Sequence, residues 1–165
     1  MVALQLSVEE IEERVLELDM QLMLKMDLHK LYYRYGLDDA SRVRAYLEEL
    51  LHSRSFSPKV TFSQFWRRRR IQLIIVVADM HSVTSHICSV NTTPDLKVLD
   101  AVIASISIPV LFTPCSLNGS ASNCTFVDGG LINYFLLSVF AQSKIHRADI
   151  HVNFNYKKRT KFFHF

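Results

Sequence analysis

Glycine is scarce in this sequence. The 165 residues contain four glycines, and Gly36 is the first of them. Glycine permits tight turns and the close approach of a backbone to a ligand, so sites that depend on a glycine-rich loop cannot lie before Gly36. This excludes a phosphate-binding loop or a glycine-flanked nucleophile from the opening segment of the chain.

Long apolar runs are also absent. The longest covers residues 131–140 and is interrupted by Asn133, Tyr134 and Ser138. It is about half as long as the 18 to 20 residues that a membrane span needs. The opening residues MVALQLSVEE lack the basic start and the long apolar core of a signal peptide. We therefore expect an intracellular protein that is cytoplasmic or attached to a membrane peripherally.

Metal-ligand patterns and a strong excess of charge are lacking as well. The cysteines Cys88, Cys115 and Cys124 have no metal-ligand spacing, and their odd number favours reduced thiols that act as small buried hydrophobes. His81 and His86 lack a third ligand nearby. A net charge of +3 with 21% charged residues is ordinary for a globular domain. We expect no metal, no cofactor and no nucleic-acid partner.

Helical periodicity dominates the amino-terminal third. Ser7 followed by Glu10 is a capping-box pattern, and the apolar spacing after it predicts one helix over residues 8–33 that ends at Gly36. Asp39 is predicted to cap a second amphipathic helix that runs to about Leu51. Its apolar stripe consists of Val43, Leu47, Leu50 and Leu51.

Strand and helix patterns alternate from residue 60 onward. Thr61 is expected to cap a short helix, and the aliphatic run at residues 71–78 predicts a central strand covered on both faces. A second strand nearer the edge is expected at residues 84–90, a helix from Thr93 and Pro94 to Pro109, and a loop over residues 110–123. Residues 149–154 alternate like a further strand. This alternation indicates a layered α/β domain.

Basic residues gather at two places. Four consecutive arginines occupy residues 67–70, and the tail at residues 157–165 is basic and aromatic. Such runs suit anionic head groups, which suggests peripheral contact with a membrane. The alternative for the arginine run is a solvated edge that precedes the strand.

The segment FVDGGLINYF, residues 126–135, is the one around which the chain is organised. A buried strand is expected to end at Asp128, and Gly129 and Gly130 allow a sharp turn beside its carboxylate. The carboxyl end of a strand is the usual position of a functional residue in an open sheet. Asp-Gly-Gly is also ordinary turn chemistry, so a purely structural turn is the alternative.

Two segments together resemble the carboxyl-terminal part of the patatin-like phospholipase domain. The first is LKVLDAVIASISIPVLFTP, and the second is FVDGGLINYF. The residues that match the family pattern are Ala104, Ser105, Ser107, Ile108, Pro109, Phe112, Pro114, Asp128, Gly129, Gly130 and Asn133.

The resemblance implies a fold and a chemistry. The fold is a layered α/β sheet with helices on both faces, here incomplete at the amino terminus. Residues 1–156 then form a partial domain, with helices within 7–52 and the sheet and motif region within 60–156. In that family a serine in a Gly-x-Ser-x-Gly turn attacks a lipid acyl ester. By this resemblance Asp128 is the catalytic base that activates the serine, without cofactor or metal.

The sequence departs from the family pattern at the nucleophile. Residues 1–165 contain neither Gly-x-Ser-x-Gly nor the glycine-rich loop of an oxyanion hole. The helix that opens at this turn would end at residues 2–6, which puts the serine about ten residues before Met1. We expect little or no esterase activity from residues 1–165 alone. The alternatives are a non-catalytic derivative that binds lipid or a partner, and a truncated product without independent stability.

Overall fold

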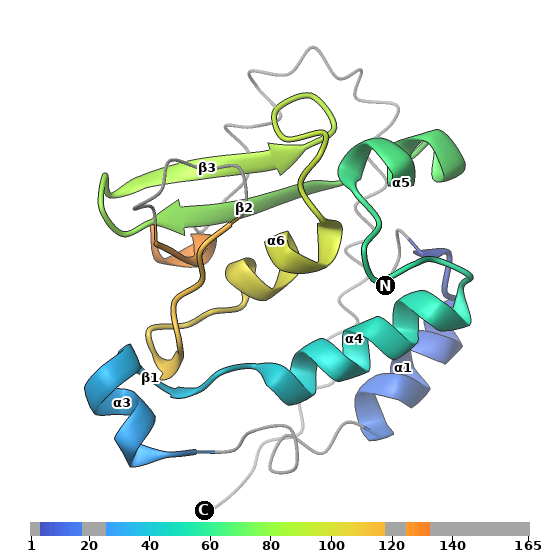
Figure 1. Ribbon diagram of the computed structural model, residues 1–165. Coiled ribbons are helices and arrows are strands. Elements are labelled where there is room, and N and C mark those ends of the chain that lie inside the picture. The colour runs from blue at the N-terminus through green and yellow to red at the C-terminus, as the bar shows by residue number, and fades with distance from the viewer. Residues whose placement is uncertain (1–3, 18–25, 118–124, 133–165) are drawn as a thin grey trace, which may run out of the picture. The chain divides into compact units, whose positions relative to one another are not determined.

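The computed structural model describes residues 4–17, 26–117 and 125–132, all of which belong to one compact unit, Met1–Tyr134 (Figure 1). These residues form a mixed α/β fold, which confirms the predicted fold class. The predicted strand at residues 149–154, the basic tail at residues 157–165 and the apolar run beyond residue 132 lie outside the described residues. The proposed domain limits stay a prediction.

A three-stranded sheet forms the centre of the described fold. Strand β2 (Ile74–Asp79) lies between β3 (Thr84–Ser89) and β5 (Phe126–Asp128), and both neighbours run antiparallel to it. Val77, which is fully buried, pairs with Asp128 on one side and with His86 on the other. The β-branched run thus becomes the central strand, as predicted, although it begins at Ile74 and not at residue 71.

A second, two-stranded parallel sheet pairs β1 (Gly36–Asp38) with β4 (Val110–Phe112). The prediction of a loop over residues 110–123 is therefore wrong for its first three residues. Gly36 makes this pairing sterically feasible, because a Cβ there would lie 2.2 Å from the backbone nitrogen of Thr113. The sequence predicts only that Gly36 ends a helix, because its role in this pairing depends on a strand that is distant in sequence.

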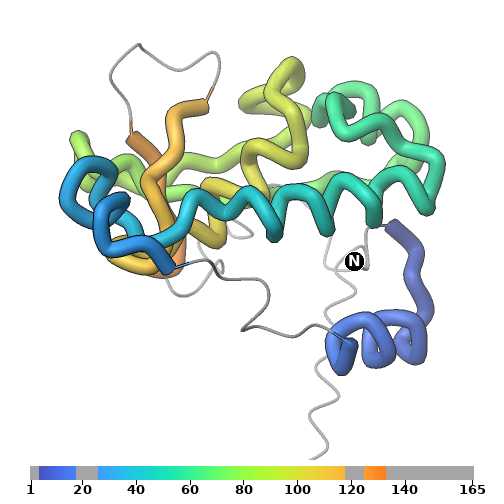
Figure 2. Tube along the Cα trace, turned by 60° about the horizontal axis from the view of Figure 1, so that its bottom comes forward, coloured from blue at the N-terminus to red at the C-terminus, as the bar shows by residue number. Residues whose placement is uncertain are grey.

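Helices are layered on the central sheet. Helix α6 (Val98–Ser105) packs against β2 and β5, and α4 (Ser41–Ser53) packs on α6. Figure 1 shows this succession of sheet, α6 and α4, and the turned view brings α4 in front of α6 (Figure 2). An ion pair of 2.9 Å between Arg44 and Asp100 joins the two helices.

Helix α6 begins later than predicted. Thr93 does not cap it, because its hydroxyl accepts a hydrogen bond of 3.2 Å from the backbone nitrogen of Ser89. Lys97, in an extended conformation, precedes the first helical residue and forms a bridge with Thr61. Thr93 and Lys97 thus bond to residues outside the helix. These bonds keep the segment from Thr93 to Lys97 out of α6.

The amino-terminal helix is broken where a single helix was expected. Helix α1 (Val8–Glu17) starts with the predicted capping box, in which Ser7 and Glu10 exchange hydrogen bonds of 2.8 and 3.1 Å. A separate helix, α3 (Leu28–Arg34), begins after Asp27, whose extended backbone and carboxylate cap it through the His29 amide at 2.9 Å. The prediction of one helix over residues 8–33 is wrong because this cap starts a new helix.

One of the two other predicted caps forms. The prediction that Asp39 caps α4 is wrong, because the residue before the helix is Ala40, which has a left-handed backbone and no side-chain cap, and Asp39 only accepts a local hydrogen bond of 3.1 Å from the amide of Ser41. Thr61 and Gln64 form a capping box that opens α5 (Phe62–Arg69). Because α5 continues through three of the four arginines, the run is mostly helical and does not form a strand edge.

Candidate active site

Asp128 is the last residue of β5, as predicted. It pairs with Val77 of the central strand and is half-buried. Its backbone nitrogen donates a hydrogen bond of 3.0 Å to the carbonyl oxygen of Ser107, which follows α6. Both the central strand and the segment after α6 therefore fix the position of the Asp128 backbone.

The two glycines form a 3₁₀ turn, Gly129–Leu131, directly after Asp128. The Asp128 carboxylate accepts a hydrogen bond of 2.9 Å from the amide of Gly130. A Cβ at position 129 would lie 2.5 Å from the carbonyl oxygen of Val76, so this residue must be glycine for the turn to approach β2. The structure thus brings Asp128, Gly129 and Gly130 together in one turn against the central strand.

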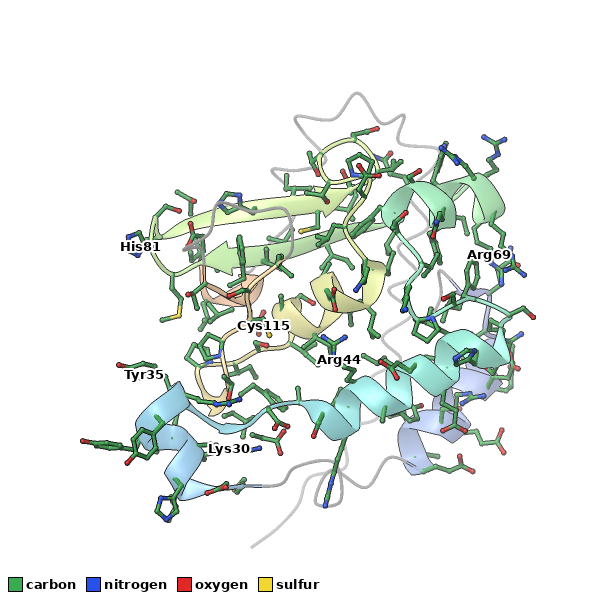
Figure 3. The ribbon with its side chains drawn as sticks, in the orientation of Figure 1. Lys30, Tyr35, Arg44, Arg69, His81 and Cys115 are labelled. Carbon is green, nitrogen blue, oxygen red and sulfur yellow. The ribbon has the colours of Figure 1, made fainter. Side chains whose placement is uncertain are left out.

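A buried polar group supports this turn from the side of α6. Ser107 is fully buried, and its hydroxyl donates a hydrogen bond of 2.7 Å to the carbonyl oxygen of Ile103. The same hydroxyl lies 3.4 Å from the sulfur of Cys115. Cys115 in turn exchanges two backbone hydrogen bonds, of 2.9 and 2.7 Å, with Phe126 of β5. Figure 3 shows Cys115 between α6 and the turn.

This support was only partly visible in the sequence. The sequence identifies Ser107 as a match to the family pattern, whereas it predicts Cys115 only as a small buried hydrophobic residue. The pairing of Cys115 with Phe126 joins residues across a segment that has no strong secondary-structure pattern, so no local signal indicates it.

The carboxylate of Asp128 is held at one oxygen. Within the described part of the chain, Oδ1 accepts the Gly130 amide and no donor bonds to Oδ2. A carboxylate in this arrangement keeps its orientation and has a second oxygen that can accept a proton from an approaching hydroxyl. The geometry suits a general base at the end of a strand.

The sequence pattern of the patatin-like phospholipase family matches residues 1–140, most of the chain. The chain belongs to the patatin-like phospholipase family. Its residues are also 26% identical over 122 positions to "Probable lipid hydrolase 463L" of Invertebrate iridescent virus 6, covering 71% of this chain and 41% of that protein. "Uncharacterized protein R571" of Acanthamoeba polyphaga mimivirus is 28% identical over 138 positions, covering 81% of this chain and 44% of that protein.

The patatin-like chain thus spans less than half the length of these two curated relatives. No solved structure matches it. The match to the family confirms the resemblance that the two motif segments indicated, and it includes the whole turn at Asp128.

A second aspartate of the patatin-like chain, Asp79, ends the neighbouring strand β2. Within the described chain, and unlike Asp128, it accepts hydrogen bonds at both carboxylate oxygens. It is buried and accepts hydrogen bonds of 2.9 Å from the His81 amide and 2.8 Å from the Ser82 hydroxyl. These bonds, with the His81 amide first, lower the pKa of Asp79. Asp79 therefore stabilises the turn between β2 and β3, whereas Oδ2 of Asp128 has no hydrogen-bond donor among the residues that the structure describes.

The three cysteines were expected to be small buried hydrophobic residues, and the structure agrees in part. Cys88 is buried, and this burial raises the pKa of its thiol, as expected for a small core residue. Cys115 is half-buried and supports the turn at Asp128, whereas Cys124 lies outside the described residues.

The arginine run is engaged in part by the protein itself. The Arg68 guanidinium donates to the carbonyl oxygen of Ser55 at 2.5 Å and lies 4.6 Å from the centre of the Phe56 ring. Arg69 donates to the side-chain oxygen of Gln5 at 2.6 Å and also lies over Phe56. Two of the four arginines thus hold α5 to neighbouring segments, which disfavours a uniform patch for head groups.

Other kinds of site are not seen in the described ranges. Among residues 4–17, 26–117 and 125–132, no three histidine, cysteine or acidic side chains are grouped so that they could hold a metal ion. None of the helices in these same ranges is both long enough and apolar enough to cross a membrane.

Proposed function

We propose that residues 1–165 supply the aspartate of a lipid acyl hydrolase that works through a serine–aspartate pair, with Asp128 as the general base. The observation that carries this proposal is the Asp128 carboxylate at the end of β5, anchored by the Gly130 amide through a single oxygen. Membership of the patatin-like phospholipase family supports a lipid ester as the substrate class.

The proposed chemistry needs a base close to a serine hydroxyl. A hydroxyl is a weak nucleophile until an adjacent base takes its proton while the oxygen attacks the ester carbonyl. In this step Asp128 accepts the proton on Oδ2 and later returns it to the leaving alcohol. The tight turn at Gly129 and Gly130 leaves room beside the carboxylate for the approaching residue.

The nucleophile is proposed to come from outside residues 1–165. Ser107 is fully buried, and its hydroxyl is bonded to Ile103. Ser105 bonds to the carbonyl oxygen of Val102 at 2.9 Å, and Ser82 bonds to Asp79. None of these three serines is followed by the glycine of a nucleophile turn. None of these three described serines is therefore proposed as the partner of Asp128.

A covalent probe tests the proposal. A fluorophosphonate, which labels activated serines, and a short-chain acyl ester should show neither labelling nor turnover with residues 1–165 alone. Labelling and ester turnover should appear in a product that carries an in-frame Gly-x-Ser-x-Gly before Met1. Turnover by residues 1–165 that Asp128→Asn abolishes would contradict the claim of inactivity. The lack of any such upstream segment would remove the proposed pair.

A further inference from the structure

Large apolar side chains are exposed around α3. No residue of this helix is buried. Leu28 is 78% exposed, Tyr32 80% and Tyr33 74%, and the flanking residues Met26 and Tyr35 are 64% and 76% exposed. Soluble proteins rarely leave so many large apolar groups together in water unless the surface binds something.

The exposed side chains form a shaped surface. Leu28, Leu31, Tyr32 and Tyr35 line a shallow hollow, and the rings of Tyr32 and Tyr33 pack edge to face at 5.0 Å. Figure 3 shows Tyr35, at the carboxyl end of α3, pointing away from the rest of the described chain, whereas Lys30 points toward it and pairs with Asp39. We call residues 26–35 the α3 surface.

Backbone pairings connect α3 to the segment that precedes the candidate active site. Helix α3 packs against β1, and β1 pairs with β4, where Val110 is 58% exposed. β4 follows Ser107, whose carbonyl oxygen holds the Asp128 amide. Beyond Asp128, Leu131 is 47% exposed. Exposed apolar residues thus occur on α3, on β4 and directly after Asp128. Figure 1 shows α3, β1 and the turn after β5 on the same side of the described fold.

Arg34 gives the α3 surface an exposed positive charge that is complementary to anionic lipid. It lies in the last turn and makes no ion pair in the described part of the chain, whereas Lys30 is paired with Asp39. His29 is exposed in the first turn. Asp27 uses its carboxylate to cap the helix. Tyrosine places its ring among acyl chains and its hydroxyl among head groups, and a basic residue beside it binds lipid phosphates.

Helix α1 also exposes apolar side chains, but they lie among acidic residues. Val8, Val15 and Leu16 are exposed there too, by 73%, 53% and 78%. The helix sequence VEEIEERVLE places these residues among five glutamates, and it contains no aromatic residue. Negative charge at this density repels an anionic surface, so α1 provides an internal control.

We propose that the α3 surface docks the protein onto an anionic lipid surface, with Leu28 and the tyrosines inserted among acyl chains and Arg34 at the head groups. This inference rests on the proposed function, because a protein that hydrolyses lipid esters must reach its substrate at a lipid surface. It differs from head-group binding by the arginine run in naming α3 as the contact.

Vesicle sedimentation with the full 165-residue chain tests the proposal. Leu28→Ser should weaken partition onto vesicles of phosphatidylserine and phosphatidylcholine about tenfold, because the apolar side chain no longer enters the acyl region. Leu16→Ser is the matched control, since both leucines are 78% exposed, and it should leave partition unchanged. Both variants remove little folded packing, and thermal melting verifies that each is folded.

A second variant tests the charge. Arg34→Gln should weaken binding to the anionic vesicles about fivefold and leave binding to pure phosphatidylcholine vesicles unchanged. Asp128→Asn should bind like the wild type, so loss of ester turnover and loss of docking are separable results.

Three results would overturn the proposal. One is the absence of vesicle binding, and another is an equal loss in Leu28→Ser and Leu16→Ser. The third is a dimer, seen by analytical ultracentrifugation, that Leu28→Ser dissociates without any change in vesicle partition, because the α3 surface would then bind a second copy of the chain.

Discussion

Helices α6 and α3 are similar in length, but α6 is packed in the core and α3 is exposed. Helix α6 has eight residues, five of them buried, and packs against the strands that carry Asp128. Helix α3 has seven residues and buries none of them. Both sequences are rich in apolar side chains, so apolar content alone does not separate a core helix from an exposed one. The difference comes from position, because α6 lies between the central sheet and α4.

The largest effect expected from this comparison is on stability. Leu99→Ala in α6 should lower the free energy of unfolding by about 3 kcal/mol, because Leu99 is 3% exposed and its loss leaves a cavity behind the site. Leu28→Ala in α3 should change it by less than about 0.5 kcal/mol. Urea denaturation measures both. Equal losses in the two variants would show that α3 is packed like α6.

A smaller effect is expected at the turn that α6 supports. Gly129→Ala should cost about 2 kcal/mol, because the new Cβ would lie 2.5 Å from the Val76 carbonyl oxygen and the turn would have to move away from β2. Gly130→Ala is the control, since its Cβ would meet only the Asp128 carboxylate, at 3.3 Å, and it should cost less than about 1 kcal/mol. If Gly129→Ala were neutral in urea denaturation, the turn would not be held against β2 as described.

The smallest expected effect is on the pH dependence of stability, and it comes from Asp79, which ends β2 as Asp128 ends β5. The His81 amide and the Ser82 hydroxyl hold the pKa of Asp79 below its usual range. A lowered carboxyl pKa stabilises the folded state above the unfolded value of about 3.9, and this contribution is lost as the pH falls below it. Asp79→Asn should therefore melt below the wild type at pH 7, and the gap should narrow below about pH 4.

Thermal melts of the two proteins between pH 2.5 and 7 measure this gap. A gap that stays constant across the range would contradict the assigned hydrogen bonds of Asp79.

Local sequence signals predicted much of the fold and the position of the candidate site. The capping boxes at Ser7 and Thr61 both form, because a cap depends only on residues three positions apart. The aliphatic run became the central strand, and the Asp-Gly-Gly motif placed Asp128 at a strand end. These features share one property, which is that the residues that determine them are close in sequence.

Features that depend on distant partners were missed. The pairing of β1 with β4 joins Gly36 to Val110, and neither segment has the length or alternation of a typical strand. The break before α3 depends on Asp27, whose cap competes with an uninterrupted apolar periodicity. The role of Cys115 depends on its pairing with Phe126. Tertiary contacts decided each case.

The base role of Asp128 is tested most directly by ester turnover in a product that also carries the Gly-x-Ser-x-Gly segment. Asp128→Asn should lower kcat at least about a hundredfold, because the amide keeps an oxygen for the Gly130 hydrogen bond but cannot take the serine proton. Asp95→Asn, at an exposed aspartate away from the turn, is the matched control and should turn over ester like the wild type. Asp128→Asn turnover within about twofold of the wild type would contradict the account.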